Sequence, residues 1–401
     1  MKTLYMMVGP QGSGKTTLFN EEFSKLDNIV RISQDDQGKQ QHFVLFMQAI
    51  SQGKNIYLDR INHTREQREK YLKPAKDANY LVKIIVLQES YAVCRKRILE
   101  RKDHPTLKSE NVDDALSMYF FQYQPPQSRE SNNIEYRGTD KQFLLDLTDK
   151  CKDKRVFIVG DLHGMYDEFV ELLTQADYSP TSDVLIFCGD LVDRGPKIDQ
   201  CLSWLSSVNE SYSVMGNHEY KFVRYLLGRK VHSKSLLATT EQTKNWNKNT
   251  LIPLIMSMPY TIKFRDNAYV VHAGINPLKP INRQYKDELM YTRNCTIGET
   301  TAPWWKFYYG DDEIYFGHEI TPQGIQVADK VFAMDGGACF GMELRLCVSN
   351  PDGTKNFFFQ KAHKAYADYR DDGYETSEPD QNRLEPYEEK VRERINFKES
   401  L

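Results

Sequence analysis

Short apolar runs rich in β-branched and aromatic residues recur along the chain, as they do in the buried strands of parallel sheets. Helical patterns lie between them. Strands that alternate with helices in this way predict an α/β fold. We therefore expect two α/β domains in series, the first built on a parallel sheet. The runs lie at residues 4–8, 29–32, 56–60, 81–87, 156–159, 184–187 and 212–215.

Each of the last three runs is followed by a short motif flanked by glycine. The motifs are Gly-Asp-Leu-His-Gly at 160–164, Gly-Asp-Leu-Val-Asp-Arg-Gly at 189–195 and Gly-Asn-His-Glu at 216–219. Sites in open α/β sheets form outside the carboxyl ends of the strands, so these side chains can meet there. One Gly-Asp pair is usually an ordinary turn, but three in register favour a site. The candidate residues are Asp161, His163, Asp190, Asn217 and His218.

Oxygen and imidazole ligands mixed in this way suit manganese, iron or zinc. Two further histidines, His272 and His318, end apolar runs at residues 268–272 and 314–318. A lone histidine after a strand is usually structural, but two with glycine neighbours supply what a second metal lacks. Asp190 could bridge two cations roughly 3.5 to 4 Å apart, which would activate a water and clamp phosphoryl oxygens.

Residues 9–17 read Gly-Pro-Gln-Gly-Ser-Gly-Lys-Thr-Thr after an apolar run, which is the strand, loop and helix order of a phosphate-binding P-loop. Such a pattern arises by chance in about one chain of this length in a hundred. Lys15 would reach the β and γ phosphates of ATP or another nucleoside triphosphate, and Thr16 would bind Mg²⁺. The candidate nucleotide-binding residues are Gly9, Gly12, Ser13, Gly14, Lys15, Thr16 and Thr17.

Two acidic positions follow the next strands. Asp35 comes after residues 29–32, where a carboxylate could accept the proton of an attacking hydroxyl. The alternative is that Asp35 only caps the following helix. Asp59 lies at the end of residues 56–60 and could hold the magnesium through water or position an acceptor.

A basic helix is expected after the strand at residues 81–87. Arg97 and Arg101 on this helix could close over the phosphates of ATP as a lid, since guanidinium groups pair with phosphate in a bidentate fork. The alternative is a solvated helix face, which explains most runs of charge.

The chain has 401 residues, a formal net charge of −3 and 27% charged residues, which describes a solvated protein of two domains. Nothing suggests a broad duplex-binding surface, although an enzyme that grips a strand end needs few cations. Seven cysteines without a Cys-x-x-Cys pair favour reduced thiols. With no signal peptide and no apolar stretch of about 18 residues, we expect no membrane contact and a cytoplasmic protein, in the host-cell cytoplasm if a phage encodes it.

The segment from residue 156 to 219 resembles the calcineurin-like metallophosphatases, especially their phosphoprotein phosphatase branch, because all three signature motifs are present. The resemblance implies an α/β sandwich of two sheets that binds two metals. It assigns one metal to Asp161, His163, Asp190 and His318. It assigns the other to Asp190, Asn217 and His272, with a share of His318.

The same resemblance implies further roles. His218 would be the general acid that protonates the leaving oxygen, with Asp193 orienting its imidazole. Arg194 and Arg293 would hold the phosphate. Glu319 departs from the family, because many relatives place a threonine after the histidine.

The first 125 residues resemble the 5′-hydroxyl polynucleotide kinases of phages and of bacterial RNA-repair enzymes. The match rests on the P-loop, the aspartate pair, residues 58–63 and the arginine-rich helix. It implies that Asp35 is the general base, acting with Lys15, and that Asp59 binds the acceptor nucleotide. Where the phage enzyme has an arginine after the aspartate pair, this chain has Gln-Gly-Lys, and Lys39 could replace it as a point charge.

The expected organisation is a P-loop kinase domain at residues 1–125, a linker at 126–151, a binuclear metallophosphatase domain at 152–360 and a charged tail at 361–401. Residues 230–249 carry no recognisable chemistry and fall where the family varies its substrate-capping elements.

A kinase and a phosphatase on one chain would cancel unless they treat different atoms, and nucleic-acid end healing meets that condition. We expect phosphorylation of 5′-hydroxyl ends with ATP or another nucleoside triphosphate and Mg²⁺. We also expect removal of 3′-phosphate or 2′,3′-cyclic phosphate by two divalent metals, manganese by preference. RNA ends are expected over DNA ends, and a separate ligase would act downstream. The rival interpretations are a nucleotide-regulated protein Ser/Thr phosphatase and a dinucleoside-polyphosphate hydrolase.

Overall fold

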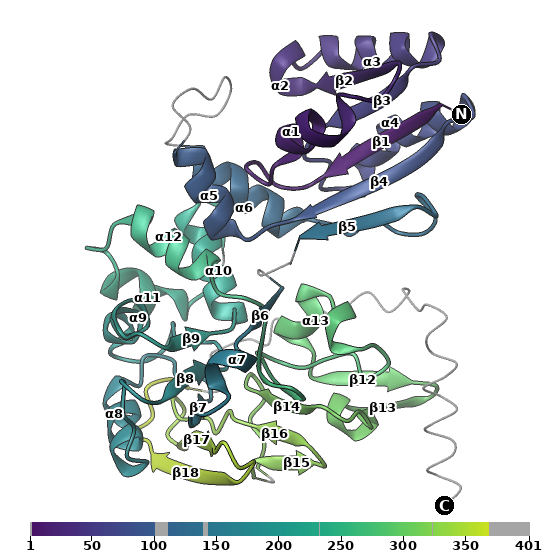
Figure 1. The fold of residues 1–401 in the computed structure, drawn as a ribbon. Helices are drawn as coiled ribbons and strands as arrows, with labels where there is room; N and C mark the ends of the chain where they lie inside the picture. Colours follow the sequence, from purple (N-terminus) through teal and green to yellow (C-terminus); the bar gives the residue numbers. More distant parts are fainter. Residues whose placement is uncertain (1, 101–110, 139–142, 232, 323, 369–401) are drawn as a thin grey trace, which may run out of the picture. The chain divides into compact units, whose positions relative to one another are not determined.

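The computed structural model describes residues 2–100, 111–138, 143–231, 233–322 and 324–368. The chain divides into two compact units, Met1–Gln142 and Phe143–Leu401 (Figure 1). Each unit combines sheets with helices, which confirms the expected α/β class for both halves. No helix within the described ranges is both long and apolar enough to cross a membrane.

The N-terminal unit is built on a five-stranded sheet in which every neighbouring pair of strands is parallel. In spatial order its strands are β2 (Ile29–Ser33), β3 (Asn55–Asp59), β1 (Thr3–Val8), β4 (Leu81–Gln88) and β5 (Ile134–Gly138). Its helices are α1 (Lys15–Leu18), continued by a π-helical turn at Phe19–Phe23, then α2 (Gln34–Gln37), α3 (Gln41–Ser51), α4 (Arg65–Asp77), α5 (Tyr91–Leu99) and α6 (Val112–Gln122).

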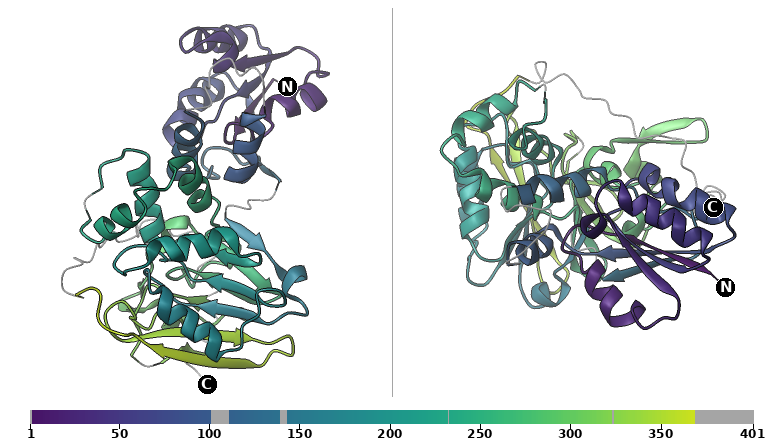
Figure 2. Two further views of the ribbon diagram at one scale, coloured as in Figure 1. Left: turned by 90° about the vertical axis from the view of Figure 1, so that its left-hand side faces the viewer. Right: turned by 90° about the horizontal axis from the view of Figure 1, so that it is seen from above.

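Helices lie on either side of this sheet (Figure 2), and apolar side chains cover both of its faces. On one face Met6 packs with Phe46 of α3 and Tyr71 of α4. On the other face Met7 packs with Phe23. Because successive side chains of a strand point to opposite faces, a strand covered on both sides is apolar at every position. This explains the continuous apolar runs in the sequence.

The described part of the C-terminal unit contains a five-stranded sheet, a six-stranded sheet and a two-stranded hairpin. The five-stranded sheet has the order β18 (Lys355–Lys361), β17 (Glu343–Ser349), β7 (Val156–Val159), β8 (Val184–Phe187) and β9 (Ser211–Ser213). The six-stranded sheet has the order β15 (Gln326–Ala328), β16 (Val331–Ala333), β14 (Glu313–Phe316), β11 (Ala268–Val271), β10 (Thr261–Arg265) and β6 (Leu144–Asp146). The hairpin joins β12 (Asn294–Ile297) and β13 (Thr300–Pro303).

The helices of this unit are α7 (Thr148–Cys151), α8 (Tyr166–Gln175), α9 (Ile198–Ser207), α10 (Asn217–Leu226), α11 (Leu236–Gln242), α12 (Lys248–Met256) and α13 (Lys286–Tyr291), with 3-10 turns at Ile281–Arg283 and Trp304–Phe307. The two larger sheets share a core, in which Ile158 of β7 packs with Ile262 of β10 and Tyr315 of β14. The outer face of β7 packs against α8, where Phe157 and Phe169 belong to one cluster. This is the α/β sandwich that the sequence predicted.

The expected linker at residues 126–151 is divided between the two units. Its first part carries Glu130, which pairs with Arg68 of α4, and β5, which pairs with β4. Its last part forms α7 and β6, and β6 pairs with β10. A short edge strand depends on pairing with a strand that lies elsewhere in the sequence. The local pattern of residues does not show that partner. Of the expected tail, residues 369–401 lie outside the described residues.

We expect Arg68→Leu to destabilise the N-terminal unit by about 3–5 kcal/mol, because it leaves the Glu130 carboxylate buried without a cation. The two side chains are 0% and 2% exposed and lie 2.7 Å apart. Urea unfolding followed by circular dichroism measures the loss. The matched control is Lys96→Leu, which removes an exposed pair with Glu100 and should change little. Similar losses in both variants would contradict the prediction.

Candidate metal centre and nucleotide site

All six predicted metal ligands follow the carboxyl ends of strands in the C-terminal unit. β7, β8 and β9 are parallel neighbours, and so are β11 and β14, so each sheet presents these ends at one edge. Both sheets therefore contribute to one site. Asp161 and His163 follow β7, Asp190 follows β8, Asn217 follows β9, His272 follows β11 and His318 follows β14.

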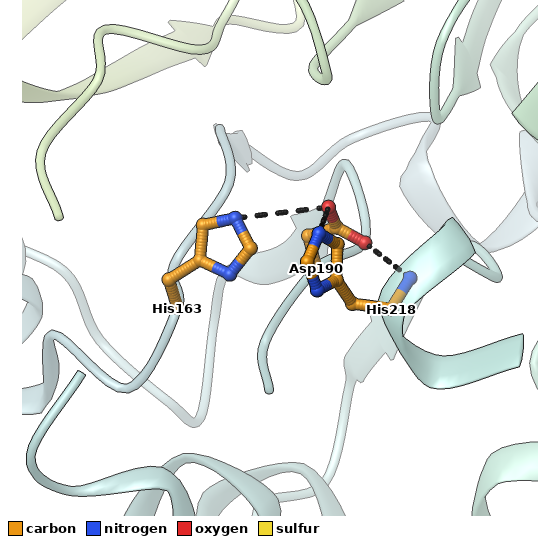
Figure 3. A group of neighbouring side chains, drawn as sticks. All are labelled: His163, Asp190 and His218. Atoms are coloured by element: carbon orange, nitrogen blue, oxygen red, sulfur yellow. Dashed lines mark hydrogen bonds and ion pairs between the residues drawn. The ribbon is translucent and has the colours of Figure 1, made fainter. Parts of the chain in front are cut away.

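Asp190 lies at the centre of the ligand set. Its Oδ2 is 3.7 Å from His163 Nε2 and 3.7 Å from His218 Nε2 (Figure 3), and its Oδ1 is 3.5 Å from His272 Nε2. His163, Asp190 and His218 form one group, and Asp190, His272 and His318 form another, with ligand atoms within 4.8 Å of one another. A carboxylate common to both groups is placed as a bridging ligand would be.

Hydrogen bonds to backbone carbonyls orient two of these imidazoles. His163 Nδ1 is 2.7 Å from the carbonyl oxygen of Val192, and His272 Nδ1 is 2.8 Å from that of Cys188. Each Nδ1–H donates to its carbonyl, which leaves Nε2 with a lone pair for a metal. His318 Nε2 is buried and has no hydrogen-bond partner in the described part of the chain. These donor atoms fit divalent cations.

Burial determines the charge state of the cluster. It lowers the pKa of His163 well below the usual value and that of His272 to about 4. It raises the pKa of Asp190 to about 7 and that of Asp161 well above its usual range. Neutral imidazoles, and carboxylates that are costly to ionise alone, are the groups that a bound dication stabilises.

Asp161 and Asn217 complete the cluster. The backbone N–H of His318 lies 3.1 and 3.0 Å from the two carboxylate oxygens of Asp161 and donates to them. A Cβ on Gly317 would lie 1.9 Å from Asp161 Oδ1, so only glycine permits this approach. Asn217 Oδ1 is 2.8 Å from His272 Nε2 and 3.1 Å from His318 Nδ1. All six predicted ligands therefore meet in one place.

Left-handed backbone conformations are concentrated at this site. Such conformations are costly for residues with side chains and persist only where the surroundings enforce them. They re-aim the chain directly after a strand, so that side chains point into the cluster. The residues are His163, Asp190, Asp193, Arg194 and His318, with φ of 43°, 52°, 70°, 69° and 63°.

Glu219 supports the loop that carries Asp190, a role that the sequence did not reveal. It is fully buried. Its Oε2 accepts from the N–H of Asp190 at 2.9 Å, and its Oε1 accepts from those of Leu191 at 2.7 Å and Val192 at 3.1 Å. Its place in the Gly-Asn-His-Glu motif was the available signal, but nothing in that motif identifies the N–H groups that it meets.

His218 and Asp193 form a buried pair, with 2.6 Å between His218 Nδ1 and Asp193 Oδ2. Thr239 of α11 donates its hydroxyl to Asp193 Oδ1 and accepts from the Asp193 N–H at 2.9 Å. Ser235 donates to Oδ2 at 3.0 Å, and Lys221 Nζ lies 2.9 Å from the same oxygen. The segment around α11, in which the sequence showed no chemistry, thus holds the partner of His218.

Arg194 and Arg293, the predicted phosphate ligands, each lie beside a metal ligand. Arg194 Nη1 contacts His163 Nε2. Arg293 Nη2 donates to the carbonyl oxygen of His318 at 3.1 Å, and its Nε lies 2.9 Å from Glu319 Oε2. Because His163 Nε2 cannot serve a guanidinium donor and a cation at once, metal binding there would leave the Arg194 guanidinium for a phosphate.

In the N-terminal unit the P-loop connects β1 to α1. Gly12 and Gly14 have φ of 79° and 97°, which residues with side chains rarely adopt. Lys15 Nζ donates to the carbonyl oxygens of Gly9 at 2.9 Å and Pro10 at 2.6 Å. The lysine therefore lies along the loop whose N–H groups would hold phosphate.

Thr16 and Asp59 meet at the ends of neighbouring elements. The Thr16 hydroxyl donates to Asp59 Oδ2 at 3.0 Å. A hydroxyl beside a carboxylate at this position fits Mg²⁺, so the geometry favours the magnesium role of Asp59 over a contact to the acceptor. Arg31 of β2, which the sequence did not single out, has its Nη2 2.7 Å from Asp59 Oδ2 and its Nη1 2.7 Å from Asp36 Oδ2.

Asp35 lies in α2, directly after β2. The N-cap of α2 is Ser33, whose side chain accepts from the N–H of Asp36 at 3.4 Å. Ser33, and not Asp35, therefore caps this helix. Burial lowers the pKa of Arg60 at the end of β3, while nearby Asp35 raises it. Lys39 is exposed. Arg60 thus interacts electrostatically with Asp35, which the motif comparison did not predict, while its Nη1 contacts His42 and Tyr71.

Arg97 of α5 lies against the P-loop. Its Nη1 donates to the carbonyl oxygen of Gly12 at 3.3 Å, and its Nη2 is 3.0 Å from Glu89 Oε2. Arg101, the other predicted lid residue, lies outside the described residues. A cavity of about 550 Å³ adjoins the loop and is lined by Gly12, Ser13, Gly14, Thr17, Leu18, Glu21, Leu87, Arg97 and Glu100.

The two halves of the chain are similar to different protein families. The calcineurin-like phosphoesterase family model matches residues 154–341, and an AAA domain model matches residues 4–126. The chain is 30% identical over 214 residues to the asymmetrical bis(5′-nucleosyl)-tetraphosphatase PrpE of Halalkalibacterium halodurans, covering 46% of this chain and 85% of that protein. The chain belongs to the calcineurin-like phosphoesterase family. It joins a metallophosphatase domain to a P-loop kinase-like domain.

Two further similarities were found. The symmetrical bis(5′-nucleosyl)-tetraphosphatase of Actinobacillus pleuropneumoniae serotype 5b is 36% identical over 129 residues, which is 30% of this chain and 45% of that protein. A solved fungal RNA kinase covers 34% of this chain and 74% of its own, at 15% identity and a TM-score of 0.29. As a calcineurin-like phosphoesterase the chain uses divalent metals, and its P-loop domain uses a nucleoside triphosphate with Mg²⁺.

We expect Asp190→Asn to remove both metals from the phosphoesterase domain, because one carboxylate faces both ligand groups. The metal content of the manganese-loaded protein, measured by metal analysis, should fall from about two equivalents to well below one. The control is Asp167→Asn, which alters a partly exposed pair with Lys197 and should keep both metals. One equivalent fully retained in Asp190→Asn would rule out the bridging role.

Proposed function

We propose that this protein heals nucleic-acid ends: its P-loop domain phosphorylates 5′-hydroxyl ends, and its metallophosphatase domain removes 3′-phosphate or 2′,3′-cyclic phosphate. The observation that carries the proposal is Asp35, a carboxylate after β2 on the sheet that carries the P-loop, next to β3 and its Asp59. A domain that only sensed nucleotide would have no use for a base on the acceptor side.

In the kinase reaction Lys15 and the P-loop N–H groups hold the phosphates of the donor. Thr16 and Asp59 would hold Mg²⁺, which supplies positive charge at the β and γ phosphates when bound. Asp35 accepts the proton of the 5′-hydroxyl as its oxygen attacks the γ phosphorus and the bond from that phosphorus to the bridging oxygen breaks, which releases the nucleoside diphosphate. We assign the phosphate of the acceptor to Arg60, whose guanidinium interacts electrostatically with Asp35.

In the phosphatase reaction Arg194 and Arg293 hold the phosphoryl oxygens. The six ligands would hold two divalent cations, which we propose to be manganese and which neutralise charge on the phosphoryl group when bound. A water attacks the phosphorus as its bond to the leaving oxygen breaks, and His218 gives its proton to that oxygen. Burial and Arg194 hold the pKa of His218 well below its usual value, so Asp193, 2.6 Å away, is needed to stabilise the imidazolium.

We further propose RNA as the substrate, action in the cytoplasm and a separate ligase as the next enzyme. A 2′,3′-cyclic phosphate requires a ribose 2′-oxygen, so one of the two ends assigned to the phosphatase exists only on RNA. A second candidate function is hydrolysis of dinucleoside tetraphosphates, which the names of the two curated relatives favour.

The test is to incubate the protein with γ-labelled ATP and an RNA that carries a 5′-hydroxyl and a 3′-phosphate, then to analyse both ends. We expect label at the 5′ end, loss of the 3′-phosphate and sealing after an RNA ligase is added. Asp35→Asn should lower labelling by about 10²-fold or more and spare dephosphorylation, while Asp190→Asn should do the reverse.

The competing function is measured on bis(5′-adenosyl) tetraphosphate in parallel. A kcat/KM on that compound above the value for RNA by about tenfold or more would favour the second candidate. Near-normal labelling by folded Asp35→Asn would show that Asp35 is not the general base.

The role of His218 can be separated from metal binding by the leaving group. On an RNA 3′-phosphate, whose leaving ribose 3′-oxygen is strongly basic, His218→Asn should lower the activity by about 10²- to 10⁴-fold. The activity of His218→Asn on nitrophenyl phosphate, whose leaving oxygen is far less basic, should fall much less. The metals should stay bound in this variant. Thr239→Val, which loosens Asp193, should show a smaller effect of the same kind, and Thr239→Ser should restore activity.

The competing role for His218 is metal ligation, because its Nε2 lies 3.7 Å from Asp190 Oδ2. Equal losses on the two substrates, or loss of metal from His218→Asn, would show that this role is the correct one.

A further inference from the structure

A carboxylate stands beside one of the two predicted phosphate-binding arginines. Glu319 Oε2 is 2.9 Å from Arg293 Nε, and each of the two side chains is 31% exposed. The position is the one at which the sequence departs from the family pattern, where a threonine is expected. A threonine would leave the guanidinium with its full positive charge toward a substrate, whereas the glutamate opposes that charge at contact distance.

The contact is built into a constrained turn. Glu319 follows His318, whose φ is 63° and whose N–H lies 3.1 and 3.0 Å from the Asp161 oxygens. The Glu319 N–H donates to the carbonyl oxygen of Gly317 at 2.7 Å. Arg293 is held from the other side by its bond to the His318 carbonyl oxygen at 3.1 Å. The carboxylate therefore stays close to the phosphate-binding edge of the cluster.

One oxygen of the Glu319 carboxylate can still accept a hydrogen bond. Its Oε2 is buried and makes no hydrogen bond among the described residues, although it is ion-paired with Arg293 Nε. The pair is thus an electrostatic contact rather than an aligned hydrogen bond. Its effect on a substrate is mainly the effect of a fixed negative charge beside the phosphate site.

We propose that Glu319 is a charge filter that selects singly charged phosphodiesters over doubly charged phosphomonoesters. This inference rests on the proposed function and deepens it. At neutral pH a terminal 3′-phosphate carries nearly two negative charges and a 2′,3′-cyclic phosphate carries one. A fixed carboxylate repels the dianion about twice as strongly as the monoanion, since Coulomb energy scales with the product of the charges. The preferred RNA end is therefore the 2′,3′-cyclic phosphate.

The experiment compares Glu319→Gln with the wild-type chain on two matched RNAs that end in a 3′-phosphate or in a 2′,3′-cyclic phosphate. Glutamine keeps the shape and removes the charge. We expect kcat/KM on the monoester to rise by about tenfold and that on the cyclic diester to change by less than about threefold. Glu319→Asp keeps the charge and should keep the wild-type preference. The control Glu343→Gln neutralises a glutamate paired with Arg345 instead and should change neither.

A second measurement does not depend on turnover. Calorimetric binding of inorganic phosphate at pH 8, where it is a dianion, should tighten in Glu319→Gln, while binding of dimethyl phosphate should not. If Glu319 only positioned Arg293, both ligands and both RNAs would change by the same factor, and that result would overturn the charge filter.

A nitrophenyl pair separates failure of this inference from failure of the proposed function. Nitrophenyl phosphate and bis(nitrophenyl) phosphate carry the same difference in charge without RNA. If neither RNA is processed but the nitrophenyl preference shifts as predicted, end healing is overturned and the charge filter stands. If the preference is unchanged on every pair, the charge filter is overturned.

Discussion

The buried carboxylate of Asp190 is the group on which the C-terminal site depends. It faces imidazoles from four other segments, and burial raises its pKa to about 7. Its position is set by the fold: β8 ends at Phe187, three residues before it, its φ is 52°, and Glu219 accepts its N–H at 2.9 Å. A carboxylate held so firmly away from water needs nearby positive charge to ionise, and the neutral histidines around it supply none. Divalent cations satisfy that need.

Asp193, three residues further along, meets the same constraint in another way. It is fully buried, yet its oxygens are satisfied by Thr239, Ser235, Lys221 and His218 rather than by a metal site. One carboxylate of the loop thus depends on cations and the other on protein donors. This separation would allow the first to bind metal while the second orients His218.

Much of the fold could be predicted because strands covered on both faces are apolar at every position. The runs at 156–159 and 184–187 coincide with β7 and β8, and their carboxyl ends gave the ligand set. Residues 126–151 were predicted as a linker, and the strands within them could not be recognised because those strands pair with edges supplied by distant segments. The contact of α11 with Asp193 was hidden for a similar reason: a serine and a threonine in a polar stretch look solvated until packing buries them. Glu319 was noticed as a departure, but its partner depends on where Arg293 lies in space.

In the N-terminal unit, sheet register brings together groups that the family motif places in one short stretch. Ser33 at the end of β2 pairs in register with Asp59 at the end of β3, so the segments that follow both strands begin side by side. Arg31 reaches Asp59 on one side and Asp36 on the other, which connects the carboxylate beside Thr16 to the acidic pair. An arginine at the position of Lys39 would project from a turn, whereas one within β2 is held by its neighbouring strand. Although the motif lacks an arginine at the position of Lys39, the chain therefore still carries guanidinium groups beside its acidic pair, from Arg31 in β2 and from Arg60 after β3.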